Sequence, residues 1–258
     1  MAGRPTRRGV EASAWWASYF DAGYLREYAP LFDPGEARAQ VGRLLELLAL
    51  PTGSRVLDLA CGQGRHAQLL AEAGLRVDGL DLSRDLLAVA TREAAGRSVR
   101  YTRGDMRRLP ARWSGRFDAV VNLFTSFGFF DEPADDAAVI HGVARVLRPG
   151  GTFVWQGGSR DGVMSRFVAR DAWVSIGGMT VEQERDFDPS SGFLTIRSIW
   201  TRGQREERRS HRIRLYSADR LAELCRSAGL RVVAVYDGFS DEALHRRSAE
   251  MLLVCRKA

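Results

Sequence analysis

From Arg55 onward, short apolar runs alternate with segments of helical periodicity, and this alternation restricts the fold more than any other feature of the chain. Five runs have the length and composition of strands: RVLDLA (55–60), RVDGLDL (76–82), SVRYT (98–102), FDAVVNLF (117–124) and TFVWQ (152–156). Helices are expected between them, at about 65–73, 83–95 and 131–147. This order predicts a parallel sheet covered by helices. RVVAVY (231–236) and MLLVC (251–255), joined as a hairpin, bring the number of strands to seven.

One segment, residues 157–216, departs from this alternation. It contains two turn signals, DPSSG and TRGQ, on either side of a run in which side chains of the two faces alternate. The same period of two recurs from Glu207 to Leu215, which predicts an inserted antiparallel sheet of about three strands. We therefore expect three parts: an N-terminal helical cap (1–50), an α/β core (51–156 and 217–258) and the inserted sheet (157–216).

The net charge of +6 comes almost entirely from arginine, because Lys257 is the one lysine among 38 basic residues. The densest basic stretch, Arg202–Arg214, holds six arginines interrupted by Glu206 and Glu207. Mixed charge of this kind is typical of a solvated strand face, so nucleic acid is not the expected partner. A non-enzymatic RNA-binding module stays open as an alternative, and the salt dependence of tRNA affinity would reveal it.

The chain offers no segment suited to a membrane or to export. Its longest stretch without a charge, residues 119–130, has twelve residues, whereas a membrane-spanning helix needs about 20. The basic N-terminus lacks an apolar core of signal-peptide length. Three scattered cysteines, at positions 61, 225 and 255, form neither a disulfide framework nor a zinc motif. We expect a cytoplasmic protein.

The segment VLDLACGQG (56–64) runs from a strand into a glycine turn and then opens a helix. Gly62 and Gly64 allow a sharp turn and the close approach of a ligand, and the helix start favours an anionic group. Asp81 ends the second strand, 23 residues after Asp58, where a carboxylate can accept both hydroxyls of a ribose. The same glycine spacing also fits a dinucleotide-binding oxidoreductase, so the turn alone does not decide the ligand.

Asp58 separates these two interpretations. A carboxylate directly before the glycine turn suits a ligand with an ammonium group and repels a pyrophosphate. S-adenosylmethionine has this ammonium, together with a carboxylate, a ribose and an adenine. The GDM sequence after the third strand supplies Asp105 for the exocyclic amine of the adenine and Met106 for its ring.

Five ordered motifs give the chain a resemblance to a known family: CGQGRHA (61–67), VDGLDLS (77–83), GDMRRLP (104–110), NLFTSFG (122–128) and RVLRPGG (145–151). The sequence resembles class I S-adenosylmethionine-dependent methyltransferases, and specifically their small-molecule group. The resemblance implies a Rossmann-like seven-stranded sheet in the order 3-2-1-4-5-7-6 with the last strand antiparallel. It also implies an N-terminal cap that closes over the cofactor and an inserted β lid that covers the substrate and in some relatives mediates dimer contact.

The predicted site for S-adenosyl-L-methionine combines the carried-over positions with residues of the turn and the cap: Tyr24, Tyr28, Asp58, Ala60, Cys61, Gly62, Gly64, His66, Asp81, Leu82, Asp105, Met106, Leu123 and Phe124. A catalytic residue is not identified by sequence, and the candidates are His66, His211 and Tyr24. His66 fits a ligand-orienting role and a polar helix cap equally well. Further aromatic residues are available as walls for a substrate: Phe127, Phe129, Trp155, Trp173 and Tyr216. Arg160, Arg166 and Arg185 are available as polar anchors.

The kind of methyl acceptor is narrowed by motifs that are missing. The fourth strand ends in Asn122-Leu-Phe-Thr, without the prolines of base-amine enzymes, the Pro-Cys of 5-methylpyrimidine enzymes or the carboxylate of magnesium-dependent catechol enzymes. Lysine occurs once, which excludes the two-lysine tetrad of 2′-hydroxyl RNA enzymes. We therefore expect metal-free N- or O-methylation of a small molecule in specialised metabolism, with a homodimer formed through the inserted sheet. An RNA-directed methyltransferase and a pericyclase or cyclase that uses S-adenosylmethionine non-catalytically stay open.

Overall fold

The computed structural model describes residues 14–28, 32–94, 96–175 and 178–258. Its larger sheet has seven strands in the order β10-β11-β5-β4-β1-β2-β3, and β11 runs antiparallel to both of its neighbours. The strands are β1 (Arg55–Leu59), β2 (Arg76–Asp81), β3 (Val99–Arg103), β4 (Phe117–Asn122), β5 (Leu147–Gly158), β10 (Leu230–Asp237) and β11 (Glu250–Lys257). The predicted strand order and the antiparallel last strand are confirmed.

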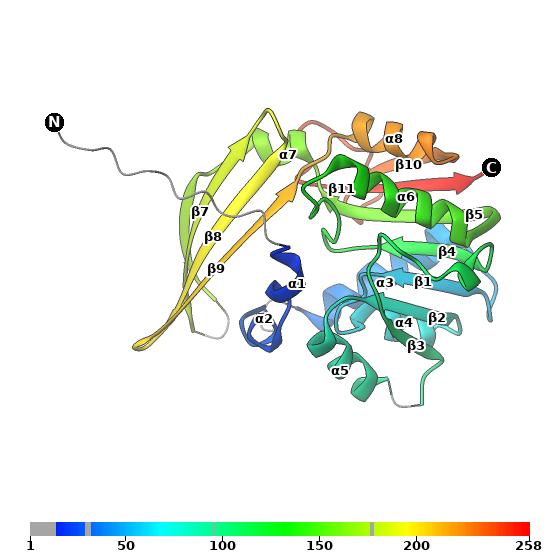
Figure 1. Ribbon diagram of the computed structural model, residues 1–258, viewed down its shortest axis with the longest axis horizontal. Helices are drawn as coiled ribbons and strands as arrows, with labels where there is room; N and C mark the ends of the chain where they lie inside the picture. Colours follow the sequence, from blue (N-terminus) through cyan, green and yellow to red (C-terminus); the bar gives the residue numbers. More distant parts are fainter. Residues whose placement is uncertain (1–13, 29–31, 95, 176–177) are drawn as a thin grey trace.

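Helices cover both faces of this sheet (Figure 1). One face packs against α3 (Pro34–Leu48) and α4 (Arg65–Glu72), the other against α6 (Pro133–Val146) and α8 (Ala218–Ser227). Alternate residues of β1 serve the two faces, because Val56 belongs to the core cluster that includes Leu44 and Leu70, whereas Leu57 belongs to the one that includes Ile140 and Leu221. Burial on both sides explains why these strands are apolar at successive positions. A further helix, α5 (Arg84–Glu93), lies against β2 and β3.

The second sheet is antiparallel and has four strands, β6 (Arg170–Val174), β7 (Thr180–Asp188), β8 (Phe193–Arg202) and β9 (Arg205–Arg214). The sequence-based number of about three was therefore too low. The missed strand is β6, whose side chains are mostly exposed, so that no clear apolar alternation marks it. Its strand character comes from pairing with β7, in the register Arg170↔Glu184. A short helix, α7 (Arg160–Ser165), connects this sheet to β5.

Within the predicted cap (1–50), α1 (Trp16–Tyr19) and α2 (Ala22–Tyr28) lie between the two sheets (Figure 1), whereas α3 packs on the core sheet, so that the cap hereafter means α1 and α2. Residues 1–13 and 29–31 of the predicted cap lie outside the described residues. On the core side, the Ala22 N–H donates to Asp85 over 3.0 Å. On the sheet side, the Arg209 guanidinium donates to the Tyr19 carbonyl (3.1 Å), to Asp21 (3.0 Å) and to the Glu27 carboxylate. The cap is thus fixed to both sheets.

A buried carboxylate joins the end of β9 to the core. Asp136 of α6 is 0% exposed, and its Oδ2 accepts hydrogen bonds from Arg214 (2.6 Å) and from the Tyr216 hydroxyl (2.7 Å). The Arg214 N–H donates to the Gly128 carbonyl over 2.7 Å. Gly128 has φ +89°, and a Cβ there would lie 2.4 Å from the Arg214 carbonyl oxygen, so a larger residue would separate the sheet from the core. None of the described helices is both long and apolar enough to cross a membrane.

The Asp136 contact should be a main anchor of the second sheet. We expect Asp136→Ala to lower the free energy of unfolding by about 3–5 kcal/mol, because it leaves the Arg214 guanidinium unpaired in a largely buried position. Urea denaturation at neutral pH measures this loss. The double variant Asp136→Ala with Arg214→Met should recover part of the stability, and a double variant less stable than the single one would contradict the anchor.

Candidate active site

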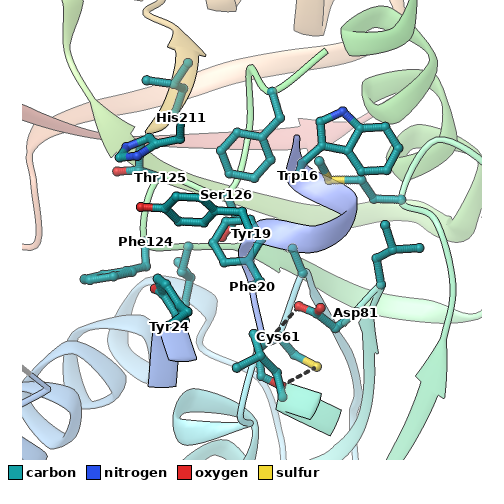
Figure 2. A pocket seen from close by; sticks show the side chains of 18 of the residues that line it. Trp16, Tyr19, Phe20, Tyr24, Cys61, Asp81, Phe124, Thr125, Ser126 and His211 are labelled. Atoms are coloured by element: carbon teal, nitrogen blue, oxygen red, sulfur yellow. Dashed lines mark hydrogen bonds between the residues drawn. The ribbon is translucent and has the colours of Figure 1, made fainter. Parts of the chain in front are cut away.

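A cavity of about 380 Å³ opens at the carboxyl ends of the parallel strands, beneath the cap and the second sheet. This volume falls in the ordinary range for small-molecule sites, and the strand ends are the usual ligand position in such folds. Figure 2 shows residues of all these parts around one space, with Asp81 from the core, Tyr19, Phe20 and Tyr24 from the cap, and His211 from β9. All the residues predicted for the cofactor site line the cavity except Gly64.

The glycine turn after β1 helps to fix the Asp81 carboxylate. The Gly62 N–H donates to Asp81 Oδ2 and the Ser83 N–H to Asp81 Oδ1, both over 2.8 Å, so this side chain is held in one orientation. Gly62 adopts φ +56°, as the sharp turn requires. Gly64 also has positive φ, and a Cβ there would lie 2.1 Å from the Tyr101 hydroxyl. Its contribution is backbone conformation and close packing, which explains its position outside the cavity wall.

Asp58 is more deeply buried than Asp81 and less well paired. It is 3% exposed, and its Oδ2 has no hydrogen-bond partner. Burial and then the neighbouring Asp81 raise the pKa of Asp58 to about 7, against the opposing effects of Arg65 and the Ala67 N–H. An unpaired buried carboxylate oxygen is unfavourable, so a cation from a ligand would stabilise this position.

Asp105 is held by a residue that the sequence analysis did not single out. Arg107 donates to both carboxylate oxygens, from Nε over 3.1 and 3.0 Å and from Nη2 over 2.6 Å. Burial alone would raise the pKa of Asp105, but the hydrogen bonds from Arg107 outweigh it and the pKa is lowered. Arg107 also pairs with Asp135 and lies over the rings of Trp16 and Phe130. The carboxylate is therefore ionised and fixed at the cavity wall.

The end of β4 contains local backbone strain. Phe124 and Thr125 adopt left-handed conformations, with φ +55° and +57°, although neither is glycine. Gln156 of β5 stabilises this turn, because its Oε1 accepts from the Phe124 N–H over 2.7 Å and its Nε2 donates to Glu250 over 2.8 Å. The sequence analysis missed Gln156, although a polar residue at the end of the apolar run TFVWQ was a usable signal.

The three catalytic candidates differ in what their polar atoms contact. His66 Nε2 lies 2.7 Å from Gln40 Oε1, which ties α4 to α3, and burial followed by Arg65 lowers its pKa to about 3. The Tyr24 ring stacks on Tyr28 at 4.5 Å, and burial raises its pKa. His211 Nδ1 is buried without a hydrogen-bond partner. Burial lowers the pKa of His211 to about 4, so the ring is neutral at physiological pH.

Aromatic rings from the cap and from the core surround His211. Its ring centroid lies 4.9 Å from Tyr19 and 5.7 Å from Trp15, and Trp15 lies 5.2 Å from Phe129. In the view of Figure 2, Tyr19 and Phe20 lie between His211 and Asp81. Seven of the residues proposed as substrate walls or anchors do not line the cavity: Phe127, Trp155, Trp173, Tyr216, Arg160, Arg166 and Arg185. Phe127 and Trp155 belong instead to the hydrophobic core.

Possible metal ligands lie apart from the cavity. Asn122, at the end of β4, donates its amide to the carbonyls of Leu59 (2.8 Å) and Ser126 (3.3 Å). Among the described residues, one group of three side chains could hold a metal ion: Asp237, at the end of β10, with Glu242 and His245 of the connection to β11. Its members do not line the cavity, and the His245 imidazole pairs with Asp237 over 3.2 Å.

Comparisons with known proteins agree with this geometry. The family model described as "Methyltransferase domain" matches residues 56–151. The dTDP-3-amino-3,6-dideoxy-alpha-D-glucopyranose N,N-dimethyltransferase of Streptomyces fradiae is 30% identical over 237 residues, which cover 86% of this chain and 91% of the relative. The chain belongs to the class I S-adenosylmethionine-dependent methyltransferases. S-adenosylmethionine is accordingly the cofactor of this methyltransferase.

Two further matches extend over most of the methyltransferase. The cypemycin N-terminal methyltransferase of a Streptomyces species is 31% identical over 218 residues, which cover 80% of this chain and 84% of the relative. The CcbJ methyltransferase structure from Streptomyces caelestis has a TM-score of 0.82 at 21% identity and covers 94% of this chain and 99% of its own. The structural likeness therefore includes the cap and the second sheet as well as the core.

The depressed histidine pKa values predict how stability depends on pH. The unfolded chain binds protons at His66 and His211 near pH 6.5, whereas the folded protein does so only near pH 3–4, so these residues lower stability as the pH falls below 6.5. Between pH 6.5 and 5.0 each histidine should lower the free energy of unfolding by about 2 kcal/mol. Urea denaturation at pH 7.5 and 5.0 measures how much free energy of unfolding is lost between the two pH values. This loss should be smaller than in wild type, by about 2 kcal/mol, in His66→Gln and in His211→Gln. Equal losses in wild type and variants would contradict the burial of neutral rings.

Proposed function

We propose that this methyltransferase transfers a methyl group from S-adenosylmethionine to the nitrogen of an amine carried by an apolar small molecule, without a metal ion. The observation that carries the proposal is the acceptor wall: the rings of Trp15, Tyr19, Phe20 and Phe129 around His211, whose buried Nδ1 lacks a partner. An apolar enclosure with one neutral hydrogen-bond acceptor suits an N–H group better than a charged or phosphorylated one.

The residues on the core side fit the cofactor. The unpaired Oδ2 of Asp58 is suited to the ammonium of the methionine moiety, and Asp81, fixed by two backbone N–H groups, is suited to the ribose hydroxyls. Asp105 would accept from the adenine amine, and Met106, Leu82 and Leu123 would contact its faces or edge. Tyr24 and Tyr28 would close the site from the cap. When bound, the cofactor supplies a methyl group on a sulfonium, which is activated for transfer.

The acceptor side performs the remaining tasks. Burial away from water disfavours an ammonium ion, and the acceptor wall contains no carboxylate to pair with one, so the acceptor nitrogen binds as the neutral amine that can attack. The His211 Nδ1 accepts a hydrogen bond from its N–H, which turns the nitrogen lone pair toward the methyl group. The cap excludes water. With S-adenosylmethionine bound, the nitrogen–carbon bond would form as the sulfur–carbon bond breaks, S-adenosylhomocysteine would be the leaving group, and the methylated nitrogen would give up its proton to water on release from the site.

Relatives support an amine and a small acceptor. One relative is a dTDP-3-amino-3,6-dideoxy-alpha-D-glucopyranose N,N-dimethyltransferase, and another is a cypemycin N-terminal methyltransferase. A metal has no candidate ligand set at the acceptor wall among the described residues, since the Asp237 group lies elsewhere. We also propose that the chain is divided into a cap, a core and a lid, and that it forms a homodimer through the second sheet.

Cofactor affinity should depend on pH through Asp58. The ammonium binds the ionised carboxylate, whereas in the free protein Asp58 takes up a proton as the pH falls through about 7. Calorimetry with S-adenosylhomocysteine should show affinity falling roughly tenfold between pH 7.5 and 6.0. Asp58→Asn should bind more weakly and lose this dependence. A variant that keeps the wild-type pH profile would show that the ammonium binds elsewhere.

The acceptor is tested with a panel of matched amines and alcohols: an amino sugar nucleotide, a peptide N-terminus and an apolar arylalkylamine, each with its hydroxyl counterpart. Mass spectrometry should find one S-adenosylhomocysteine released per methyl transferred to nitrogen, and a chelator should leave the rate unchanged. His211→Ala should lower kcat about 100-fold without changing S-adenosylhomocysteine affinity, and His211→Asn, which places an amide oxygen near the lost Nδ1, should restore part of it.

Three outcomes would contradict the proposal. Methylation of the alcohols alone would make the enzyme an O-methyltransferase. A transformed acceptor without release of S-adenosylhomocysteine would indicate a cyclase or pericyclase that uses the cofactor non-catalytically. Methylation of tRNA in preference to every member of the panel would make the acceptor a nucleic acid.

A further inference from the structure

We infer that the indole N–H of Trp15 donates a hydrogen bond to an oxygen of the methyl acceptor, and that the acceptor is an amine with this oxygen on the neighbouring carbon atom, as in a β-amino alcohol. Trp15 stands directly before α1 and lines the cavity. The inference rests on the proposed function in one respect, the placement of the acceptor amine at His211.

The Trp15 ring is held by three parts of the protein. Its centroid lies 5.3 Å from that of Tyr19 in the cap, 5.2 Å from that of Phe129 in the loop after β4, and 5.7 Å from that of His211 on β9. The contacts with Tyr19 and Phe129 are edge to face, an arrangement that aromatic pairs favour. A ring packed in this way has little freedom to turn, so its N–H keeps one direction.

The N–H of this ring is both buried and unsatisfied. Trp15 Nε1 is inaccessible to solvent and has no hydrogen-bond partner in the described part of the chain. A buried donor without an acceptor costs free energy, which a ligand in the cavity would recover. An indole nitrogen donates and does not accept, so the group that it binds is an acceptor such as a hydroxyl, ether or carbonyl oxygen.

His211 supplies the complementary half of the pair, because its buried, unpaired Nδ1 is the acceptor for the N–H of the amine. The two ring centroids lie 5.7 Å apart, so a ligand that meets both rings carries its N–H and its oxygen close together, as on adjacent carbon atoms. The amine nitrogen cannot itself accept from Trp15, since its lone pair attacks the methyl group. An electron-withdrawing oxygen beside the amine also lowers the pKa of its ammonium form and favours the neutral amine.

The remainder of the acceptor meets hydrocarbon on the cavity face of the second sheet. Ile196 pairs with His211 across β8 and β9, and Leu194 pairs with Ile213 two residues further along. Leu194, Ile213 and Leu215 are buried and form one cluster with Ile196 at its edge. This row suits the apolar body of the acceptor. Three different contacts, at nitrogen, at oxygen and at the apolar body, distinguish the mirror images of a chiral amino alcohol.

A purely structural Trp15, serving only to pack Tyr19 against Phe129, would give a different result. Its replacement would impair every acceptor by a similar factor. A hydrogen-bonding Trp15 instead distinguishes two amines that differ in one oxygen atom. The test therefore compares 2-amino-1-phenylethanol, as separate enantiomers, with 2-phenylethylamine, which lacks only the hydroxyl group.

Mass spectrometry follows methyl transfer from S-adenosylmethionine to each probe in wild type, Trp15→Phe and Trp16→Phe. Trp16 is the matched control, because its indole also lines the cavity but packs against Phe130 and Arg107. Wild type and Trp16→Phe should use one enantiomer of the amino alcohol with a kcat/KM about tenfold above that of 2-phenylethylamine. In Trp15→Phe this preference, and that between enantiomers, should fall below about threefold, while 2-phenylethylamine stays within about threefold of wild type.

Each outcome decides the inference. A preference for the oxygen that survives in Trp15→Phe would overturn it, as would a wild type without this preference or an equal loss with both amines. Thermal melting identifies a folding defect in Trp15→Phe, and β-(3-benzothienyl)alanine at position 15, which replaces the N–H by sulfur and keeps the bicyclic shape, then serves as the test.

Failure of the proposed function is separable. A methyl group found on the oxygen, or on neither amine, contradicts N-methylation itself. The preference for the oxygen is then measured without turnover, by calorimetry of the probes with the complex of the protein and S-adenosylhomocysteine. Equal affinity for the amino alcohol and 2-phenylethylamine, or binding of neither, would overturn the role of Trp15.

Discussion

The cavity depends on one buried guanidinium, that of Arg209, which holds the cap against the second sheet. It donates to the Tyr19 carbonyl and to the carboxylates of Asp21 and Glu27, and its side chain is largely buried. Side chains two residues apart on a strand point to the same face, so His211 follows Arg209 on the side of β9 that meets the cap. Strand β9 thus supplies both Arg209, which fixes Tyr19, and His211, against which Tyr19 packs. The acceptor wall forms as a consequence.

Unpaired charge is concentrated on the cofactor side of this cavity. Several arginines elsewhere in the protein, such as Arg107, Arg209 and Arg214, form ion pairs with carboxylates of the chain. Asp58 and Arg65 each keep a buried polar atom without a partner, and His211 does the same on the acceptor side. Such groups destabilise the free protein and make ligand binding correspondingly more favourable, because a bound cofactor and acceptor replace the water that these atoms have lost.

The strained turn after β4 lies between the two halves of the site. Phe124 stacks on Arg65 from one side of the turn, while Gln156 holds the Phe124 N–H from the neighbouring strand. Two successive left-handed residues are unfavourable on their own, so this turn persists because β5 and β11 fix the position of Gln156 through Glu250. The position of Arg65 is in this way coupled to the order of the sheet.

The sequence by itself determined the seven strands of the core and the cofactor motifs at the strand ends. These follow from local patterns, namely apolar runs, glycine turns and helix caps, whereas the order of the strands was implied only by the resemblance to a family. Tertiary structure alone decided the features that join distant segments: the pairing of β6 with β7, the Asp105–Arg107 contact with Asp135, the support of Phe124 by Gln156, and the aromatic rings around His211. Sequence periodicity records which face of an element is buried, but not which distant element covers that face. The site depends on such long-range contacts, and the identity of the free polar atoms therefore became visible only once the chain was folded.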